Sequence, residues 1–487
     1  MKRFKKIDLY FAAAYGYIFL PFLIFTLGWI KLFYAIPTVI CVSIGLYRMF
    51  QSTPERERFE WNAKNKKRII WIAVIILLWV AVSGIGGIAF QNEDHIWRNA
   101  MFETLVQEKW PVIKVVIKDG VRSTRGFSYY FGFWMVPALV GKLFGLQAGY
   151  YFQIIWAFVG VMLFYYGICL IRRKIEVWPL AVFVFYSGAD ILGYYLMGWN
   201  ILKVPTTEHL EWWTLFQFSG ITTQLFWVFN QAIPAWLITV LLYLQKNNRY
   251  IFFILSAALL NCTLPAVGLI PICIWWVFSR DYEAKRFCAQ WWKSWLKDTV
   301  TVENVLCGGL IGILSALFLK RPTFADVGMF VDLTNGGWLV WLVFLAVEIG
   351  GICVAVYRYQ KRNPLFYVMV VWLCLCPLPR VYGGENFCMR ASIPALLILY
   401  IYVVEALVQS YHKKNRIHLA ITLVVLAVGA VTPLHELTRT VSETAAIYNS
   451  EDENIRVESV GTAAVLSNSY ESVNVWESVF YAGFAKY

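Results

Sequence analysis

The chain has 487 residues, of which 59% are hydrophobic and only 15% are charged, and its mean hydropathy is +0.58. A soluble domain could not bury this much apolar surface, and a membrane β-barrel would show alternating segments of about 10 residues. The formal charge of +13 does not indicate nucleic-acid binding, because the lysines and arginines fall mainly in short gaps between apolar segments, where they orient membrane helices. The composition therefore predicts an all-α polytopic membrane protein.

Apolar runs of about 18 or more residues recur along most of the chain and predict about 13 transmembrane helices. The first three are residues 9–29, 31–50 and 69–90. We divide the chain into a transmembrane domain, residues 1–433, and a small polar tail without a span, residues 434–487. The basic N-terminus has no convincing cleavage site after it, so we expect an uncleaved first helix that starts in the cytoplasm.

The basic loops predict the topology by the positive-inside rule. Lysines and arginines gather in loops that we therefore place in the cytoplasm: 51–68, 246–249, 280–300, 358–363 and 410–416. The segments between them are then extracytoplasmic, namely the first large loop 91–128, the second loop 199–229, the segments 320–337 and 379–391, and the tail.

One segment, 129–146, breaks this count, because a crossing there would place the basic loop 172–174 outside. It contains Pro137, Gly141 and Lys142 and is the weakest span of the chain. We expect it to be re-entrant from the outer side. The alternative is a crossing in which the basic loop violates a statistical rule.

Two further segments depart from a plain span. Residues 250–279 contain an Asn-Cys-Thr-Leu-Pro sequence at 261–265, which predicts two shorter helices broken near Pro265. Residues 283–298 place tryptophans among lysines and arginines, the pattern of a helix lying in the inner membrane interface. The ten cysteines lie mostly inside apolar segments without metal-ligand spacing, so no disulfide is expected.

The first candidate site follows the third apolar segment. Glu93 and Asp94 place two carboxylates at the predicted exit of that helix, beside His95 and ahead of Tyr129 and Tyr130. Asp94 could act as a general base toward an acceptor hydroxyl or help to hold a divalent cation. The structural alternative is that these residues only end the helix in water.

The second candidate is Asp190, about two turns from the outer end of its predicted span. An ionisable group inside a membrane is costly and is usually retained for a pathway or a site. A hydrogen bond to Ser187 or to a neighbouring helix is the alternative. Glu348, inside the predicted span 338–357, is equally costly, and nothing near it in the sequence indicates its role.

The third candidate lies in the second outer loop, where acids, an imidazole and indole rings occur within six positions: Glu208, His209, Glu211, Trp212 and Trp213. The charged residues are close enough in sequence to converge as acid, base or metal ligands, although this spacing is no metal signature. The tryptophans are either sugar-stacking faces or, more commonly, anchors in the membrane interface.

The fourth candidate is the outer segment 383–394, which contains Glu385, Asn386 and Arg390. Arg390 comes just before an apolar helix, where the positive end of the helix and the guanidinium would together bind phosphate. Arg380 is its neighbour in sequence. The alternative for both arginines is a topological role or a contact with lipid headgroups.

These segments resemble the GT-C superfamily of polyprenyl-phosphate-sugar-dependent membrane glycosyltransferases, and within it an uncharacterised bacterial branch with similar NxD (92–94), HxEWW (209–213) and NFxMRASxP (386–394) segments. The resemblance covers about residues 65–435. It implies that Asp94, with Glu93 as substitute, is the catalytic base or a metal ligand, that Asp190 or Glu208 is a second acid, and that Arg390 binds the donor phosphate. Three spans precede the key loop where many relatives have one, the tail is small, and no DxD motif occurs in either loop.

The resemblance implies transfer of a sugar from a polyprenyl-phosphate donor to a cell-envelope acceptor, at the outer face of a bacterial cytoplasmic membrane. No metal ligands are assigned, and a divalent cation, Mg²⁺ or Mn²⁺, stays open as a cofactor. Membrane lipids, the lipid-linked donor and the acceptor are the expected partners. Two other functions remain open: a transporter or flippase that uses Asp190 and Glu348 along a central path, and a non-catalytic subunit of an envelope complex.

Overall fold

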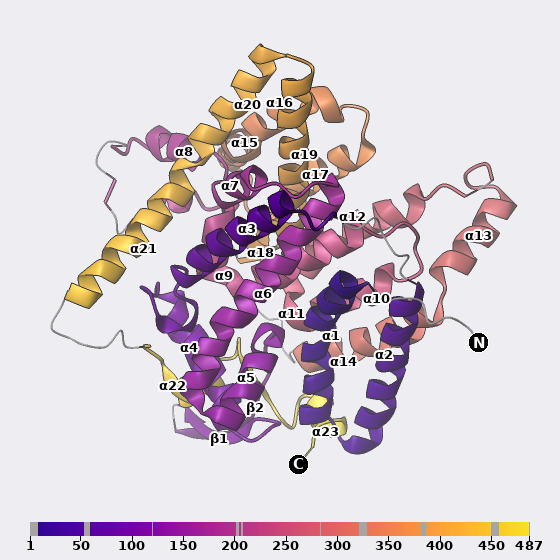
Figure 1. Cartoon of the computed structure of the whole chain (residues 1–487). Helices are drawn as coiled ribbons and strands as arrows, with labels where there is room; N and C mark the ends of the chain where they lie inside the picture. The colour runs from indigo at the N-terminus through magenta and orange to yellow at the C-terminus, as the bar shows by residue number, and fades with distance from the viewer. Residues whose placement is uncertain are drawn as a thin grey trace.

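In a computed structural model of the chain, the structure describes residues 8–52, 59–118, 120–200, 204–205, 208–282, 284–320, 329–380, 386–449 and 457–486. Most of these residues are helical (Figure 1). The helices of the first half are α1 (Leu9–Trp29), α2 (Leu32–Ser52), α3 (Ala63–Ala81), α4 (Asp94–Gln107), α5 (Gly132–Phe144), α6 (Leu146–Arg172), α7 (Trp178–Val184), α8 (Asp190–Leu196) and α9 (Ile221–Tyr243).

The helices of the second half are α10 (Ile251–Ser256), α11 (Ala258–Asn261), α12 (Thr263–Ser279), α13 (Ala289–Thr299), α14 (Gly308–Leu319), α15 (Gly337–Leu345), α16 (Gly351–Gln360), α17 (Pro364–Leu375), α18 (Asn386–Ala391), α19 (Ile393–His412), α20 (Arg416–Gly429), α21 (Val431–Asn449), α22 (Gly461–Ser467) and α23 (Val479–Gly483). Short 3₁₀ turns lie at η1 (Ile85–Gly87) and η2 (Leu210–Trp213), and π-helical turns at η3 (Glu303–Cys307) and η4 (Ala346–Gly350).

The described part of the chain contains 7 helices that are long and apolar enough to cross a membrane, or 8 if the bent pair α13 and η3–α14 counts as one span. Four shorter apolar helices accompany them: Gly132–Phe144, Ile251–Asn261, Thr263–Ser279 and Pro364–Leu375. The chain is thus a helical, multi-pass membrane protein, as its composition predicts. The number of about 13 spans stays a prediction.

Helix α9 forms the centre of the bundle, because its whole apolar stretch is buried inside the protein. It packs against α6 and α19, and Figure 1 shows it surrounded by helices from both halves of the chain. Most of its residues are apolar, which suits a helix in such an enclosed position, although it also buries polar side chains such as Gln224, Asn230 and Gln231. α9 therefore fixes the positions of the loops on either side of it.

The first outer loop and the tail fold together, which the sequence does not predict. The strands β1 (Ile113–Lys118) and β2 (Val121–Phe127) form an antiparallel hairpin, and β5 (Ser472–Asn474) of the tail pairs with β2. Helix α22 packs on α4, and Figure 1 shows this group, which we term the loop–tail unit, at the lower edge of the molecule. A second, two-stranded sheet joins β3 (Met329–Phe330) to β4 (Pro379–Arg380).

The prediction that Asp94 lies at the exit of the third membrane helix is wrong. Helix α3 ends at Ala81, well before the predicted residue 90. Gly84, Gly86 and Gly87 follow with φ angles of 83°, 75° and 75°, a left-handed conformation that ends a helix and is accessible mainly to glycine. Asp94 instead begins a new helix, α4.

Helix α5 occupies most of the ambiguous segment 129–146. The chain enters this segment from β2, where the carbonyl of Phe127 accepts a hydrogen bond from Tyr481 of the tail. Lys142, in the last turn of α5, donates to the carbonyl of Val106 at the end of α4, 3.0 Å away. Both ends therefore contact the loop–tail unit, and a 13-residue helix is only about 20 Å long against about 30 Å of hydrocarbon. Re-entry stays a prediction.

The expected break near Pro265 is confirmed. Cys262 has φ −154° and ψ 68° and separates α11 from α12. The predicted amphipathic segment 283–298 contains α13, which is bent by 55° from η3–α14.

The expected continuous span around Asp190 is broken. Helix α7 ends at Val184, and Asp190 is the first residue of α8, so it lies at a helix start and not within a span. The chain between the two helices is held by hydrogen bonds to other elements: Ile221 N–H donates to the carbonyl of Tyr186, and Ala189 N–H to that of Val347. These contacts satisfy main-chain groups that a continuous helix would have paired within itself, so the rest of the fold stabilises the break.

Candidate functional site

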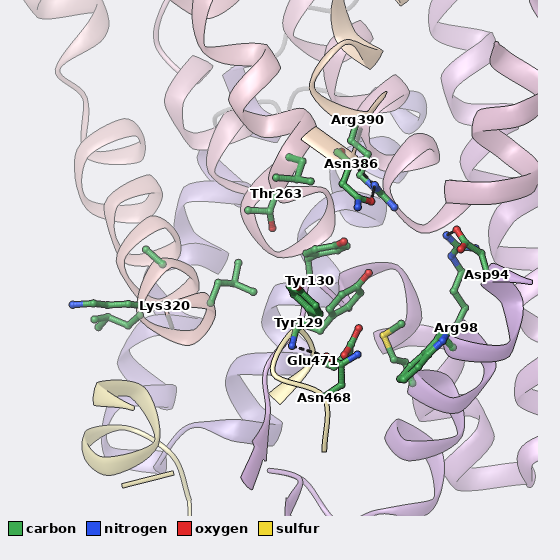
Figure 2. A pocket seen from close by; sticks show the side chains of 17 residues that line it. Asp94, Arg98, Tyr129, Tyr130, Thr263, Lys320, Asn386, Arg390, Asn468 and Glu471 are labelled. Carbon is green, nitrogen blue, oxygen red and sulfur yellow. Dashed lines mark hydrogen bonds and ion pairs between the residues drawn. The ribbon is translucent and has the colours of Figure 1, made fainter. Parts of the chain in front are cut away.

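A cavity of about 850 Å³, here called the polar cavity, lies where six parts of the chain meet. Figure 2 shows side chains from α4, the segment after β2, α18 and the tail directed into the same space. Five residues predicted as site residues line it: Asp94, Tyr129, Tyr130, Asn386 and Arg390. One wall is apolar and comes from the start of α12 and the end of α14, with Leu264, Ala316, Leu317 and Leu319.

Asp94 is held at the rim of the polar cavity by the start of α4. Its main-chain N–H donates to Asn92 Oδ1 at 3.2 Å, and its side chain pairs with Arg98 one turn later, at 2.6 Å between Arg98 Nη2 and Asp94 Oδ2. Burial raises the pKa of the Asp94 carboxyl, but the positive charges of Arg98 and Arg390 lower it by more. The pKa of Asp94 therefore lies below its usual value. The carboxyl, whose side chain is 42% exposed, is therefore ionised at neutral pH and accessible.

His95 anchors this helix to the centre of the bundle. Its Nε2–H donates to the carbonyl of Phe226 in α9 at 3.0 Å, and Asn92 Nδ2 donates to the same oxygen at 2.9 Å. Gln91 Nε2 lies 3.4 Å from Nδ1 of the ring, which fixes the tautomer. Burial, together with the Arg98 charge, lowers the pKa of His95 to about 3, so the ring is neutral and has a structural role.

Arg390 lies across the polar cavity from Asp94 (Figure 2). The residue is only 7% exposed, and its Nη1 donates to the side-chain and main-chain oxygens of Asn386. Among the described residues it has no carboxylate partner, and its buried Nε has no hydrogen-bond acceptor. The charge of Arg390 acts on Asp94, but the two form no ion pair, and a buried guanidinium that makes no direct contact with an anion is costly, so this position is suited to receive one.

Several residues of the polar cavity were missed by sequence reasoning. Lys320 follows α14 and adds a second cation without a described ion pair, and its place directly after an apolar segment was a usable signal. Asn468 and Glu471 come from the tail, and no local pattern marks them. Tyr129 and Tyr130 contact each other with ring centroids 3.8 Å apart, and burial raises the pKa of the Tyr129 phenol, which therefore stays protonated.

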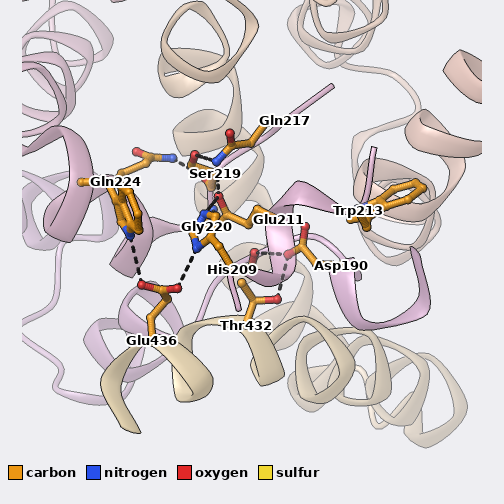
Figure 3. A network of polar contacts seen from close by, with 12 residues as sticks. Asp190, His209, Glu211, Trp213, Gln217, Ser219, Gly220, Gln224, Thr432 and Glu436 are labelled. Atoms are coloured by element: carbon orange, nitrogen blue, oxygen red, sulfur yellow. Dashed lines mark hydrogen bonds and ion pairs between the residues drawn. The ribbon is translucent and has the colours of Figure 1, made fainter. Parts of the chain in front are cut away.

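The second outer loop does not reach this cavity. Figure 3 shows its side chains in a separate, enclosed cluster, here called the His209 network. His209 Nδ1 lies 2.8 Å from Glu436 Oε1, and its Nε2 lies 3.5 Å from Glu211 Oε2. Glu211 also accepts from Gln217 Nε2 at 2.7 Å and from the main-chain N–H of Gly220 at 2.8 Å.

The imidazole of His209 carries a charge in this network. Burial lowers the pKa of His209, but the hydrogen bonds and charges of Glu211 and Glu436 outweigh it and raise the pKa to about 9. Glu436 is satisfied in addition by Trp227 Nε1 at 3.1 Å and Arg439 Nη2 at 2.6 Å. Every charge of the cluster has a partner, so the predicted role of His209 and Glu211 in substrate binding is not supported by the geometry.

Asp190 lies beside the His209 network (Figure 3). Its Oδ2 accepts from Ser187 at 3.1 Å and from Thr432 at 2.8 Å, the first of which is the structural alternative considered above. Glu348, in the π-helical turn η4, lies beside it and accepts from Trp213 Nε1 at 3.1 Å. Both acids are buried and neither lines the polar cavity.

The remaining predicted residues lie outside both clusters. Glu93 and Glu208 are exposed, and Arg380 is exposed in β4. Trp212 is half-exposed, with its ring 4.9 Å from that of His209, and Glu385 lies outside the described residues. No group of three or more His, Cys, Asp or Glu residues in the described ranges is arranged to hold a metal ion.

Comparison with known proteins adds no relative. No protein-family model, curated protein or solved structure matches the chain.

Proposed function

We propose that the protein is an integral membrane glycosyltransferase that moves a sugar from a polyprenyl-phosphate donor to an acceptor in the cell envelope. The observation that carries this proposal is the presence, in one cavity, of an accessible carboxylate, Asp94, and a buried guanidinium, Arg390, that forms no ion pair with any described residue. The apolar wall formed by α12 and α14 suits a lipid-linked phosphate, because it offers hydrocarbon beside a phosphate-binding group.

In this reaction, the oxygen of an acceptor hydroxyl attacks the anomeric carbon of the sugar, and the bond from that carbon to the phosphate oxygen breaks. The hydroxyl proton passes to Asp94, which is ionised beforehand. The electron pair of the broken bond stays on the phosphate, whose growing charge Arg390 stabilises. Lys320, at the same cavity, adds a second positive charge.

The proposal includes the architecture that the resemblance implies: about 13 spans in a GT-C-like arrangement, in a bacterial cytoplasmic membrane, with the loop–tail unit outside and the N-terminus inside. A divalent cation, Mg²⁺ or Mn²⁺, is compatible with the proposal as a ligand of the donor phosphate. The aromatic pair Tyr129 and Tyr130 supplies a face for the sugar ring.

The test is transfer of radiolabel from the polyprenyl-phosphate-sugar pool of membranes to their acceptors. Replacing Asp94→Asn removes the base while keeping the shape, and we expect a loss of about 10²–10⁴-fold. Glu93→Gln is the matched control, since it changes the adjacent, exposed carboxylate that does not line the cavity. Equal transfer by Asp94→Asn and wild type, at equal protein level and thermal stability, would refute the proposal.

A second candidate is a transporter or flippase, which the buried acid pair Asp190 and Glu348 favours. The two side chains meet where α7 breaks from α8 and where the span Gly337–Gln360 contains a π-helical turn. Irregular backbone with buried acids is a feature of transport sites. In this case Asp190→Asn would abolish the movement of a fluorescent polyprenyl-phosphate sugar across the bilayer of proteoliposomes that contain the protein. Asp94→Asn would leave this movement unchanged.

A further inference from the structure

A second hollow of about 350 Å³, here called the basic hollow, lies at the opposite end of α12 from the polar cavity. Thr263 and Leu264, at the start of α12, line the polar cavity, and Arg280, just after its end, lines the basic hollow. A helix of 17 residues is about 25 Å long, so the two sites lie near opposite surfaces of the membrane.

Positive charge dominates the lining of the basic hollow. Four of its residues are cations, Lys246, Arg249, Arg280 and Lys297, and two are acids, Asp281 and Asp298. No ion pair is found in the described part of the chain for any of the four cations.

Both acids are already occupied. Asp298 Oδ2 accepts from the main-chain N–H of Asn248 at 2.8 Å and from the hydroxyl of Tyr282 at 3.0 Å. Asp281 Oδ1 pairs with Arg286 at 2.8 Å. The donors to Asp298 are neutral, so this carboxylate keeps its charge and acts on Arg280, but four cations face only two acids, one of which is paired with Arg286. The lining therefore keeps an excess of positive charge, which makes it a site for an anion.

The floor of the basic hollow is rigid. Arg280 Nε donates to Asn248 Oδ1 at 3.2 Å, which orients the guanidinium, and its buried Nη2 has no partner among the described residues. Asn248 is fully buried and donates in turn to the carbonyl of Val277 at 2.9 Å and to the hydroxyl of Thr299 at 3.1 Å. These contacts join the segment between α9 and α10 to the ends of α12 and α13, so the guanidinium of Arg280 is already oriented as a donor.

The surroundings of the basic hollow place it at a membrane surface. Helix α13, which provides Lys297, also exposes Trp292 and Leu296, and Phe287 is exposed just before it. Exposed aromatic and aliphatic side chains interleaved with lysines are typical of a helix that lies in the headgroup region. An anion that reaches the hollow from this surface is most abundantly a lipid phosphate.

We propose that the basic hollow binds the phosphate of an anionic phospholipid headgroup, on the membrane surface opposite the polar cavity. Arg280 is the oriented donor, and Lys246, Arg249 and Lys297 supply the surrounding charge. The lipid's acyl chains extend along the exposed apolar side of α13. This proposal is independent of the reaction in the polar cavity and holds for a transporter as well as for an enzyme.

The test uses the purified full chain in nanodiscs of phosphatidylcholine with or without phosphatidylglycerol, with retained lipid counted by native mass spectrometry and thermal unfolding measured in parallel. The double variant Lys246→Ala/Lys297→Ala removes two lining charges and spares the buried Arg280 contact. The matched control is Lys285→Ala/Lys293→Ala, which removes the same charge from exposed positions of the same region that do not line the hollow.

We expect wild type and control to retain phosphatidylglycerol and to gain thermal stability from it, and the lining variant to lose retention by at least about fivefold. Equal loss in both variants would mean diffuse attraction to an anionic surface and would overturn the proposal. Inorganic phosphate separates the sources: if it displaces the phospholipid at millimolar concentration and stabilises the chain equally, the site takes a free anion and the lipid proposal fails.

Discussion

The polar cavity and the His209 network use the same kinds of side chain and differ in how many partners each charge has. In the network, the imidazole lies between two carboxylates, and Glu436 has three donors. In the polar cavity, Arg390 has only a neutral amide, and its Nε has no acceptor in the described part of the chain. A charge that the fold satisfies stabilises the fold, and a charge that it leaves unsatisfied is available to a ligand.

The difference between the two regions predicts opposite effects of neutralising a charge. In the His209 network, Glu436→Gln leaves His209 and Arg439 without their shared carboxylate, and removing one partner of a buried pair costs about 3–5 kcal/mol of unfolding free energy. Thermal and denaturant unfolding in detergent would measure the loss. Glu443→Gln, on the same helix and outside the network, is the control and should unfold like wild type.

In the polar cavity, Arg390→Gln should behave in the other way. We expect transfer to fall by about 10²–10³-fold, because one oriented donor to the leaving phosphate is lost. The unfolding temperature should stay the same or rise, since an unpaired buried charge is removed. A large drop in stability with this variant would show that Arg390 has an internal partner and would remove the distinction between the two regions.

The two regions also differ in pH dependence. The pKa of His209 is about 9 in the folded chain and near the usual 6.5 when unfolded. Its contribution is fully present below about pH 6.5, is lost as pH rises to 9, and amounts to about 3 kcal/mol. Unfolding curves between pH 6 and 10 would show this alkaline loss. The same curves for His209→Gln should lack it, and an identical slope in both proteins would contradict the charged imidazole.

The smallest predicted effect concerns Lys320, an exposed cation at the polar cavity. Lys320→Ala removes one charge that attracts the donor, which corresponds to about a fivefold rise in the KM for donor with kcat unchanged. Lys109→Ala, at another exposed lysine that does not line the cavity, is the control. An effect on kcat instead would assign Lys320 to the reacting groups.

Hydropathy and loop charge suffice to predict the multi-pass helical fold, and the residues around Pro265 suffice to predict a broken helix, since these features depend on local sequence. The sequence also places Asp94, Tyr129 and Arg390 on one side of the membrane, and the structure brings them to one cavity. Hydropathy predicts the depth of a residue in the bilayer, and this depth suffices to predict that these residues lie on the same side of the membrane.

Lateral position is not readable in this way, and the errors follow from it. The sequence places Asp94 and His209 on the same side of the membrane, yet they belong to separate clusters, although His95 and His209 contact adjacent residues of α9, Phe226 and Trp227. The tail's share in the cavity depends on the pairing of β5 with β2, whose partners are about 350 residues apart and carry no local signal. The early end of α3 depends on three glycines whose left-handed angles only the fold reveals.

The pairing of β5 with β2 also sets an order in time. Residues 461–474 leave the ribosome after every described helix long enough to cross the membrane, and they supply Asn468, Tyr470 and Glu471 to the polar cavity. The hairpin of β1 and β2 is synthesised far earlier. Until β5 has been made, the edge of β2 that pairs with β5 stays without its partner strand. The cavity is therefore closed last, and a nascent chain holds all its spans before it holds a complete site.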